Sequence, residues 1–386
     1  MKKICLFIGL LSLLIPSITR AEEVDLAPNA NSAIIIEATS GEIIWQKNAH
    51  EKLPPASMTK IASMLLFMEN IEKGNLKWDE EITASENASS MGGSQIFLEA
   101  GEKMSVNDML KGVAIASGND ATVALAERVA GTEEAFVSLM NEKVRELGLK
   151  NTSFKNSTGL DIANHYSSAY DMAMLAKELV KHEKILEFTG TYEDYLRKGT
   201  DKSFWLVNTN KLVRYYEGVD GLKTGFTNEA GYCLTSTANI NGMRLITVVM
   251  GEPTSEKRSE ETSAMLDYGY NMYEVEKLLT IESKIKNIKI NLGKDEYVSV
   301  VPVRDIDILN NKTENKRNVT YNISLKNVTA PVKKGDIVGK VEVIENGKVI
   351  EEVEVTIENN VSKANFFTVF FRNIKDIIEG DINIWF

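Results

Sequence analysis

The spacing of hydrophobic and polar positions predicts strands near both ends of the stretch from residue 22 to about residue 275. Apolar runs at 33–37 and 42–46 lie on either side of a short Thr-Ser-Gly turn and predict a hairpin. Apolar runs at 232–238 and 243–250 flank an Asn-Gly pair, which is a strong signal for a second hairpin. The chain therefore supplies strands both before and after its central segment.

Between these hairpins, apolar positions recur at the three- and four-residue intervals of an amphipathic helix. The first predicted helix covers 58–71. Three more begin at capping residues and cover 105–116, 132–148 and 168–181. Residues 256–278 have the same helical pattern. We therefore expect helices to fill the middle of this stretch and to close it.

After about residue 280 the pattern changes to short alternating runs separated by clusters of Asn, Gly, Asp and Lys. These runs continue to about residue 360 and predict a small all-β domain, with a sandwich as the expected form. Residues 364–386 then show a helical pattern with a bulky apolar face, formed by Phe366, Phe367, Phe370, Phe371, Ile374, Ile377 and Ile378. Such a helix can lie in a membrane interface, although an amphipathic helix can also dock on its own protein.

The first 21 residues are typical of a signal peptide. Lys2 and Lys3 precede an apolar run at 4–15, which is short for a membrane span, and Ala21 ends a stretch with small residues at the cleavage positions. An uncleaved anchor is the alternative. We expect an exported protein. Cleavage of the signal peptide removes Cys5 and leaves Cys233 as the single cysteine. The exported protein therefore cannot form an internal disulfide, which suits a bacterial envelope.

The composition excludes other classes of protein. The 386 residues carry a formal net charge of −11 at pH 7, so they lack the basic surface of a nucleic-acid binder. Three histidines, two cysteines and no His-Glu-x-x-His motif leave little material for a metal site. We expect no nucleic-acid partner, no metal and no other cofactor.

Ser57-Met58-Thr59-Lys60 is the first of three short motifs that can carry chemistry. Residues i and i+3 share a helix face, so Lys60 can reach Ser57 and act as the base that a serine nucleophile needs, provided that its pKa is depressed. A second Ser-x-x-Lys, at 283–286, lies in a strand-like run, where positions three apart point to opposite faces. Only the first copy is a candidate, with an ordinary helix-start serine as its alternative.

Ser117-Gly118-Asn119 and Lys223-Thr224-Gly225 are the other two motifs. The first lies at a break between two helical patterns, from which side chains can project into a cleft; helix capping is the alternative. A second Ser-x-Asn, at 85–87, lies in a polar stretch that we interpret as a solvated loop. The Lys-Thr-Gly triplet lies beside a predicted strand. There the lysine and threonine can bind a carboxylate and the glycine lets a ligand approach the backbone, with an ordinary turn as the alternative.

Ser-x-x-Lys, Ser-x-Asn and Lys-Thr-Gly form the set known for penicillin-binding proteins and class A β-lactamases. With the longer blocks 55–60, 116–121, 165–171 and 219–227, the chain resembles the low-molecular-mass penicillin-binding proteins, the serine D-alanyl-D-alanine carboxypeptidases, over essentially its whole length. The resemblance implies an α+β fold, with a β-lactamase/transpeptidase-like catalytic domain (antiparallel sheet with helices) followed by a small all-β sandwich and an amphipathic helix. The implied boundaries are 1–21 for the signal peptide, 22–278 for the catalytic domain, 279–362 for the β-rich domain and 363–386 for the membrane-anchoring helix.

The resemblance also implies the catalytic roles. Ser57 attacks the carbonyl between the two terminal D-alanines of a peptidoglycan stem peptide, and Lys60 accepts its proton. Ser117 relays a proton to the leaving D-alanine, and water then hydrolyses the acyl-enzyme. The charge on Lys223 helps to keep Lys60 neutral.

The other motif residues are implied to bind the substrate. Asn119 orients the substrate backbone, and Lys223 and Thr224 hold the terminal carboxylate. Gly225 gives the ligand room, and the backbone N–H of Phe226 forms an oxyanion hole with that of the nucleophile. Relatives often carry a different side chain after Lys-Thr-Gly, so the contacts of the Phe226 side chain stay open.

The implied partners are peptidoglycan stem peptides, β-lactam antibiotics as covalent inhibitors, and a membrane surface reached through the C-terminal helix. This places the protein on the outer face of the bacterial cytoplasmic membrane. A β-lactamase is an alternative, but it usually lacks the β-rich domain, and no Glu-x-x-x-Asn loop lies between Ser117 and Lys223. A DD-endopeptidase or transpeptidase with the same site, and a non-catalytic peptidoglycan-binding scaffold, stay open.

Three further residues have two interpretations each. Arg258 could support the carboxylate site, but an exposed helix charge is the preferred interpretation. His165 could be a general base, but a structural histidine beside a helix start is preferred, because Ser57 already has Lys60. Cys233 lies in an apolar run and is predicted to be a buried core residue.

Overall fold

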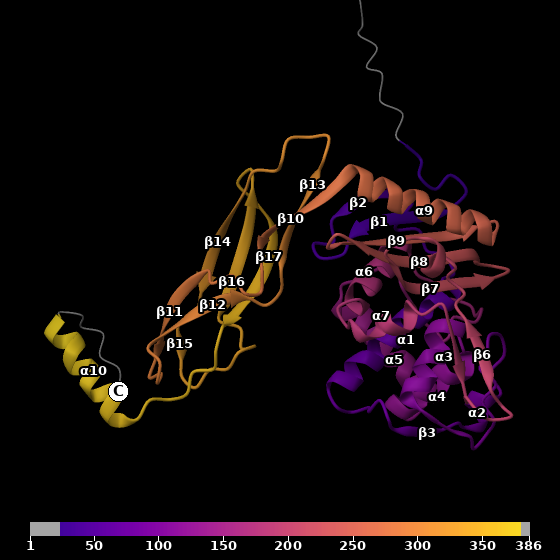
Figure 1. The fold of residues 1–386 in the computed structure, drawn as a ribbon, viewed down its shortest axis with the longest axis horizontal. Coiled ribbons are helices and arrows are strands. Elements are labelled where there is room, and N and C mark those ends of the chain that lie inside the picture. Colours follow the sequence, from indigo (N-terminus) through magenta and orange to yellow (C-terminus); the bar gives the residue numbers. More distant parts are fainter. Residues whose placement is uncertain (1–23, 380–386) are drawn as a thin grey trace, which may run out of the picture.

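The computed structural model describes residues 24–379. The predicted signal peptide at 1–21, and the end of the predicted tail at 380–386, lie outside the described residues. Figure 1 shows a globular body of helices and sheet, an elongated β-rich body beside it, and the helix α10 at the end farthest from the globular body.

A five-stranded antiparallel sheet with the strand order β2-β1-β9-β8-β7 is the frame of the globular body. Its strands are β1 (Ser32–Glu37), β2 (Ile43–Lys47), β7 (Val219–Thr227), β8 (Gly231–Ile240) and β9 (Met243–Glu252). Both predicted hairpins are confirmed, as β1–β2 and β8–β9. The N-terminal strands pair directly with β9, so segments about 200 residues apart form one sheet, with β7 at its edge.

Helices cover both faces of this sheet (Figure 1). The central helices are α1 (Lys60–Glu72), preceded by the 3₁₀ turn η1 (Ala56–Thr59), α3 (Val106–Ala116), α4 (Asn119–Ala130), α5 (Glu133–Glu146), α6 (Ala169–Leu179), α7 (Lys184–Thr189) and the single turns α2 (Glu86–Ser89) and α8 (Leu212–Tyr215). Two small hairpins flank them: β3 (Glu81–Thr83) with β4 (Lys103–Ser105), and β5 (Glu193–Leu196) with β6 (Phe204–Val207). The helix α9 (Ser255–Met272) packs on the opposite face.

The predicted helix starts are confirmed by their caps. The hydroxyl of Ser105 accepts the N–H of Asp108 at 3.1 Å, that of Thr132 accepts the N–H of Ala135 at 3.1 Å, and Ser168 caps α6 in the same way. A side-chain oxygen at this position satisfies an N–H that has no partner within the helix. The sequence could predict these helix starts because a cap is a contact between residues only three positions apart.

Two sequence interpretations are wrong in detail. The helix expected over 256–278 ends at Met272, and Tyr273–Leu279 is the strand β10, which pairs with β13 (Ile306–Asn311). Tyr273 and Val275 are half-buried while Glu274 and Glu276 are exposed, which is the two-residue period of a strand. The 85–87 triplet is not a solvated loop, because Ser85 caps the short helix α2.

The all-β prediction for the second domain is confirmed. A six-stranded sheet has the order β14-β16-β17-β12-β11-β15, and β10 pairs with β13 in a second sheet. The further strands are β11 (Lys286–Asn291), β12 (Tyr297–Pro302), β14 (Val319–Leu325), β15 (Val328–Thr329), β16 (Gly339–Glu345) and β17 (Lys348–Ile357). Residues of both sheets, such as Ile306, Val341 and Val355, share one apolar core. The second Ser-x-x-Lys begins in the loop before β11 and ends on the first residue of that strand, so it does not lie on a helix.

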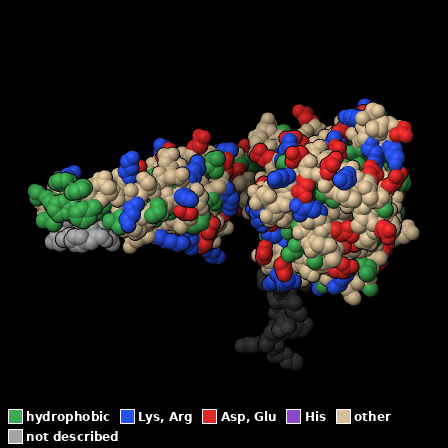
Figure 2. All heavy atoms as spheres, turned by 90° about the horizontal axis from the view of Figure 1, so that it is seen from below, with side chains coloured by type: hydrophobic (Ala, Val, Ile, Leu, Met, Phe, Trp, Pro, Cys, Tyr) green, Lys and Arg blue, Asp and Glu red, His purple; other side chains and the backbone are tan. Residues whose placement is uncertain are grey.

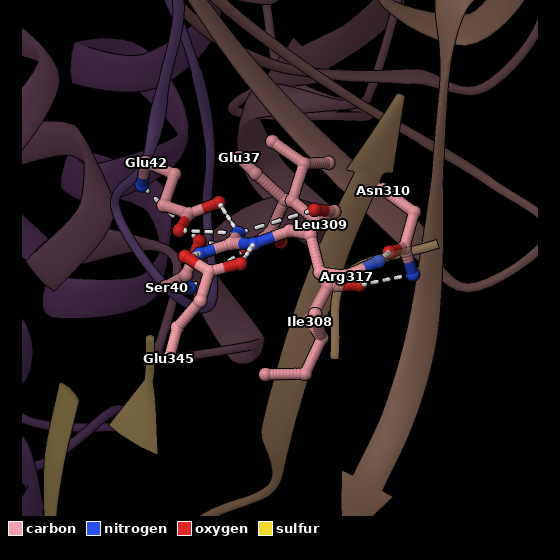
Figure 3. A network of polar contacts seen from close by, with 8 residues as sticks. All are labelled: Glu37, Ser40, Glu42, Ile308, Leu309, Asn310, Arg317 and Glu345. Atoms are coloured by element: carbon pink, nitrogen blue, oxygen red, sulfur yellow. Dashed lines mark hydrogen bonds and ion pairs between the residues drawn. The ribbon is translucent and has the colours of Figure 1, made fainter. Parts of the chain in front are cut away.

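Arg317 connects the two bodies (Figure 3). Its Nη1 donates to both carboxylate oxygens of Glu42, at 2.7 and 2.8 Å, and Glu42 belongs to the β1–β2 turn of the globular body. Its Nε and Nη2 donate to Glu345 of the β-rich body, at 2.8 and 3.0 Å. One guanidinium therefore bridges a carboxylate from each body, and its two parallel bonds to Glu345 have the geometry of the strongest ion pairs.

The helix α10 (Phe366–Glu379) lies against the far end of the β-rich body. Arg372 donates to the backbone carbonyls of Gly293 and Lys294, at 2.6 and 2.7 Å. Its large apolar side chains remain exposed, with Phe366 at 72% and Ile378 at 79%, and Figure 2 shows them gathered at that end of the molecule. Within residues 24–379, no helix is both long and apolar enough to cross a membrane.

Candidate active site

Ser57 lies in the η1 turn, one residue past a backbone with a positive φ of 47° at Ala56. Two glycines touch this turn from other parts of the chain. A Cβ at Gly159 would lie 1.9 Å from the carbonyl oxygen of Ala56, and a Cβ at Gly225 would lie 2.6 Å from that of Pro55. Only glycine leaves room for such close backbone contact. The turn that presents Ser57 is therefore held between two distant segments.

Lys60 is the first residue of α1 and is completely buried. Its Nζ lies 3.1 Å from Ser57 Oγ and donates to Asn119 Oδ1 at 2.6 Å and to the carbonyl oxygen of Thr158 at 2.7 Å. All three partners are uncharged. Burial, and next the positive charge of Lys223, hold the pKa of Lys60 well below its usual range, against the opposing effect of Asp120. Lys60 can therefore be a neutral amine in contact with Ser57.

Ser117-Gly118-Asn119 lies at the junction of α3 and α4, as the sequence predicts. Ser117 ends α3 with a φ of 63°, in the left-handed region. Its Oγ is buried and has no hydrogen-bond partner, which is unusual for a buried hydroxyl. Asn119 is fixed instead, since its Nδ2 donates to the carbonyl oxygen of Gly92 at 2.7 Å. The motif thus holds a rigid amide beside Lys60 and a hydroxyl free to bond a ligand.

Lys223, Thr224 and Gly225 lie within β7, so the alternative of an ordinary turn is wrong. Lys223 is buried, and its Nζ donates to the carbonyl oxygen of Thr224 at 3.0 Å. Burial, and next the charge of Arg258, lower the pKa of Lys223 to about 7. Thr224 Oγ1 donates to Thr209 Oγ1 at 2.6 Å. An anion arriving here would favour the charged form of Lys223.

The burial of Arg258 shows that the preferred sequence interpretation, an exposed charge on a helix, is wrong. Arg258 lies on α9 with 7% of its surface exposed, and its Nε has no hydrogen-bond partner. A buried cation without a partner is costly, and such groups are usually found at ligand sites. The signal in the sequence was weak, because the buried face of α9 also carries the polar residues Glu261 and Thr262.

The family model described as D-alanyl-D-alanine carboxypeptidase matches residues 18–254. The chain belongs to this family. A second family model, described as penicillin-binding protein 5, C-terminal domain, matches residues 273–363. Its first matched residue is also the first residue of β10.

Similar proteins cover almost the whole chain. The D-alanyl-D-alanine carboxypeptidase DacF of Bacillus subtilis is 50% identical over 353 residues, which is 91% of each chain. Penicillin-binding protein 5 of Haemophilus influenzae has a similar structure, with a TM-score of 0.69, 32% identity, and coverage of 87% of this chain and 98% of that one. Penicillin-binding protein D2 of Listeria monocytogenes in its cefotaxime-bound form has a TM-score of 0.58 and 32% identity, covering 64% of this chain and 99% of that one.

His165 is structural, as preferred from the sequence. Its Nε2 lies 2.8 Å from Thr59 Oγ1, and its Nδ1 accepts the N–H of Lys155 at 3.1 Å. Burial is the main cause that lowers the pKa of His165 to about 4. Both ring nitrogens are thus occupied, and the ring supports the η1 turn that carries Ser57. Cys233 is confirmed as a core residue, with no exposed surface.

Metal-binding geometry is not found in the part of the chain that the structure describes. Within residues 24–379, no three His, Cys, Asp or Glu side chains lie close enough together to hold an ion.

Proposed function

We propose that this chain removes the terminal D-alanine from peptidoglycan stem pentapeptides by way of an acyl-enzyme on Ser57. The observation that carries the proposal is the contact between Lys60 and Ser57, at 3.1 Å, made by a buried amine with no carboxylate partner. A hydroxyl becomes a nucleophile when a base takes its proton, and a neutral amine is such a base.

The first half of the reaction forms the ester. Ser57 Oγ attacks the carbonyl carbon between the two D-alanines, and its proton passes to Lys60 Nζ. The backbone N–H groups of Ser57 and Phe226 stabilise the oxyanion. As the peptide bond breaks, the Ser117 hydroxyl delivers a proton to the nitrogen of the leaving D-alanine and is itself reprotonated from Lys60. The free Oγ of Ser117 suits this relay.

The second half hydrolyses the ester. Lys60 takes a proton from a water molecule, which attacks the acyl carbon, and Ser57 recovers its hydrogen as the shortened peptide leaves. Asn119 needs to hold the acyl chain in place during this step, and its rigid amide supports that role.

The terminal carboxylate is bound by Lys223 and Thr224 in this proposal. Arg258 adds a second positive charge behind Lys223, and its unpartnered Nε is available for a bond to the carboxylate or to a bridging water. A free terminal carboxylate is then the feature that selects a carboxypeptidase substrate. β-Lactams carry a carboxylate in a similar relation to a reactive carbonyl, so they should acylate Ser57, as the ligand-bound relatives suggest.

Mass spectrometry of products from a defined pentapeptide tests this function. Release of a single D-alanine is expected, and Ser57→Ala should abolish both that release and labelling by a fluorescent penicillin. A cross-linked product, or cleavage only of cross-linked dimers, would point instead to transpeptidase or endopeptidase activity. A folded protein that neither labels nor releases D-alanine would be a non-catalytic scaffold.

We further propose that the protein is exported and lies on the outer face of the cytoplasmic membrane, attached through α10. The exposed apolar face of α10 supports this, because four phenylalanine rings in water are costly unless a membrane or a partner covers them. Arg372 fixes the other side of the helix to the β-rich body. The apolar face can therefore lie flat on lipid while the body stands above it.

A further inference from the structure

A second hydroxyl group contacts Thr224, the threonine that is proposed to bind the terminal carboxylate. Thr224 Oγ1 donates to Thr209 Oγ1 at 2.6 Å, within the usual range for two hydroxyl groups. Thr209 is half-buried and lies two residues beyond the end of β6. It belongs to none of the three motifs, and the packing of its loop against β7 brings it to Thr224.

The two residues beside Thr209 hold its loop in place. Asn208 and Asn210 are each only 1% exposed. Asn208 Nδ2 donates to the carbonyl oxygen of Thr189 at 2.9 Å, and Asn210 Nδ2 donates to that of Gly221, on β7, at 3.0 Å. The Oδ1 atoms of both asparagines accept backbone N–H groups within the loop. Because these bonds do not involve the side chain of Thr209, a change of that side chain should leave the loop in place.

The backbone of Thr209 reaches the other side of the site. Its N–H donates to the carbonyl oxygen of Ile115 at 3.3 Å, two residues before Ser117 at the end of α3. In the proposed reaction, Ser117 protonates the nitrogen of the leaving D-alanine and Thr224 binds its carboxylate. Thr209 therefore contacts both segments that act on the leaving D-alanine.

The bond between the two threonines can change direction, because a hydroxyl group has one hydrogen to donate and can also accept. In the structure, the hydrogen of Thr224 points to Thr209. A carboxylate can only accept, so Thr224 must turn its hydrogen to the substrate when the substrate binds. The bond between the threonines is then kept only if Thr209 donates to Thr224 Oγ1. Hydrogen bonds in such a chain polarise and strengthen one another.

We propose that Thr209 is a positioning residue for the terminal carboxylate, whose hydroxyl group donates to Thr224 while Thr224 donates to the substrate. The proposal rests on the proposed function and deepens it, because it names a residue that acts through Thr224 in the choice of a free carboxylate. The chain of two hydroxyl groups should matter most for a charged acceptor, since hydrogen bonds to ionised groups are about twice as strong as neutral ones.

Two pentapeptides that differ only at the C-terminus test the proposal, one with a free carboxylate and one with a carboxamide. Thr209→Ser keeps the hydroxyl group, and Thr209→Ala differs from it by a single oxygen atom. We expect Thr209→Ala to lower kcat/KM for the carboxylate peptide about fivefold, the effect of one hydrogen bond. The value for the carboxamide peptide should change less than about twofold. Thr209→Ser should restore the preference for the carboxylate.

A matched control and a second variant complete the design. Thr200→Ala removes an exposed hydroxyl group that donates to the carbonyl oxygen of Arg197 in the β5–β6 turn, so it should keep both values. Thermal melting checks that each variant folds. Thr209→Val has the shape of threonine without its hydroxyl group and gives the same comparison if Thr209→Ala is unstable. Acylation by a penicillin and by its methyl ester replaces the peptide pair if cleavage of the carboxamide is too slow to follow.

The outcomes separate the two proposals. An equal loss for both peptides in Thr209→Ala would show that Thr209 only supports its loop, and would overturn the positioning role. Unchanged values in folded Thr209→Ala or Thr209→Val, or a loss in Thr209→Ser as large as that in Thr209→Ala, would overturn it as well. All of these results leave the carboxypeptidase function standing. Failure of the wild-type protein to release D-alanine from the carboxylate peptide overturns the proposed function, and the positioning role with it.

Discussion

Lys60 combines two properties that are rarely found together, since it is a completely buried lysine and has no acidic hydrogen-bond partner. Its three acceptors are a hydroxyl, an amide and a backbone carbonyl. They orient the amine without stabilising its charge as a carboxylate would. The charge on Lys223 acts in the same direction. The amine is thereby prepared to take a proton from Ser57.

Replacement of Lys60 by Arg should be nearly as damaging as replacement by Ala. Arginine keeps the positive charge but cannot act as a base at working pH. We expect acylation by a fluorescent penicillin to slow by about a hundredfold to ten-thousandfold in both variants, the range for loss of a general base. Lys286→Arg, in the second Ser-x-x-Lys, is the matched control and should label normally. Near-normal acylation by Lys60→Arg would show that Lys60 contributes only its charge.

His165 should make the fold sensitive to acid. The ring stays neutral in the folded protein down to about pH 4, whereas an unfolded histidine titrates near pH 6.5. The unfolded state therefore binds more protons in this window, and the free energy of unfolding falls as the pH drops from 6.5 to 4. We expect a loss on the order of 2 kcal/mol at pH 4.5.

Denaturant unfolding at pH 7 and pH 4.5 measures this effect. His165→Gln can keep a bond to Thr59 but cannot titrate, so its stability should change less between the two pH values. His50→Gln, at an exposed position, should behave like the wild type. An equal pH dependence in His165→Gln and wild type would assign the acid sensitivity to other groups.

The elements around the site work as a clamp on the η1 turn. Gly159, in the loop before α6, and Gly225, in β7, both press on the backbone that leads to Ser57. This arrangement brings a helix start, a loop and a sheet edge within van der Waals contact. A nucleophile held on such a turn keeps its position relative to Lys60 without relying on its own side-chain contacts.

Gly159→Ala should therefore damage both stability and chemistry. The new Cβ would lie 1.9 Å from the Ala56 carbonyl oxygen, at a φ of 88°, so the turn must shift. We expect a loss of about 3 kcal/mol or more in stability, from steric clash in addition to backbone strain, and acylation slowed at least about tenfold. Thermal melting and penicillin labelling measure the two effects.

Gly148→Ala is the matched control for this prediction. Gly148 also has a positive φ, of 68°, but nothing lies within 4 Å of a Cβ there. Its replacement should cost only the backbone strain, about 1 kcal/mol, and labelling should stay normal. Equal effects of the two substitutions would mean that the contact with the η1 turn is unimportant.

On the scale of the whole molecule, the site, the β-rich body and α10 lie in sequence along one axis (Figure 1). Arg317 ties the two bodies through Glu42 and Glu345, so the globular body is attached by more than the chain connection at β10. The apolar face of α10 lies at the opposite end from the globular body (Figure 2). A membrane bound at that end would leave the site accessible to substrate above the lipid.

Removal of residues 364–386 should release the protein from membranes while sparing its chemistry. The tail has no excess of positive charge, since Arg372 and Lys375 are accompanied by Asp376, Glu379 and Asp381. Attachment should therefore rest on apolar burial rather than on anionic lipid. Full-length protein should resist extraction by high salt and be extracted by detergent, and fractionation of cells with each form measures this. A truncated form that still pellets with membranes, or a full-length form that salt removes, would contradict the anchor.

Sequence alone determined the features that depend on short-range physics. Helix caps such as Ser105 involve residues three positions apart, hairpins follow from alternation around a tight turn, and the reach of Lys60 to Ser57 follows from one helical turn. The order of the three motifs then gave the family resemblance. The all-β second domain could also be predicted, because its apolar residues recur every two positions, unlike those of the preceding helices.

Tertiary structure alone decided the rest. No local pattern distinguishes Arg258 from an exposed helix charge, because its burial depends on which face of α9 meets the sheet. The end of that helix at Met272 depends on the pairing of β10 with a strand about 35 residues away. The clamp of Gly159 and Gly225 on one turn exists only when distant segments pack together. Local spacing specifies which groups can react, whereas long-range packing determines their burial, and burial sets their protonation and the room left for a ligand.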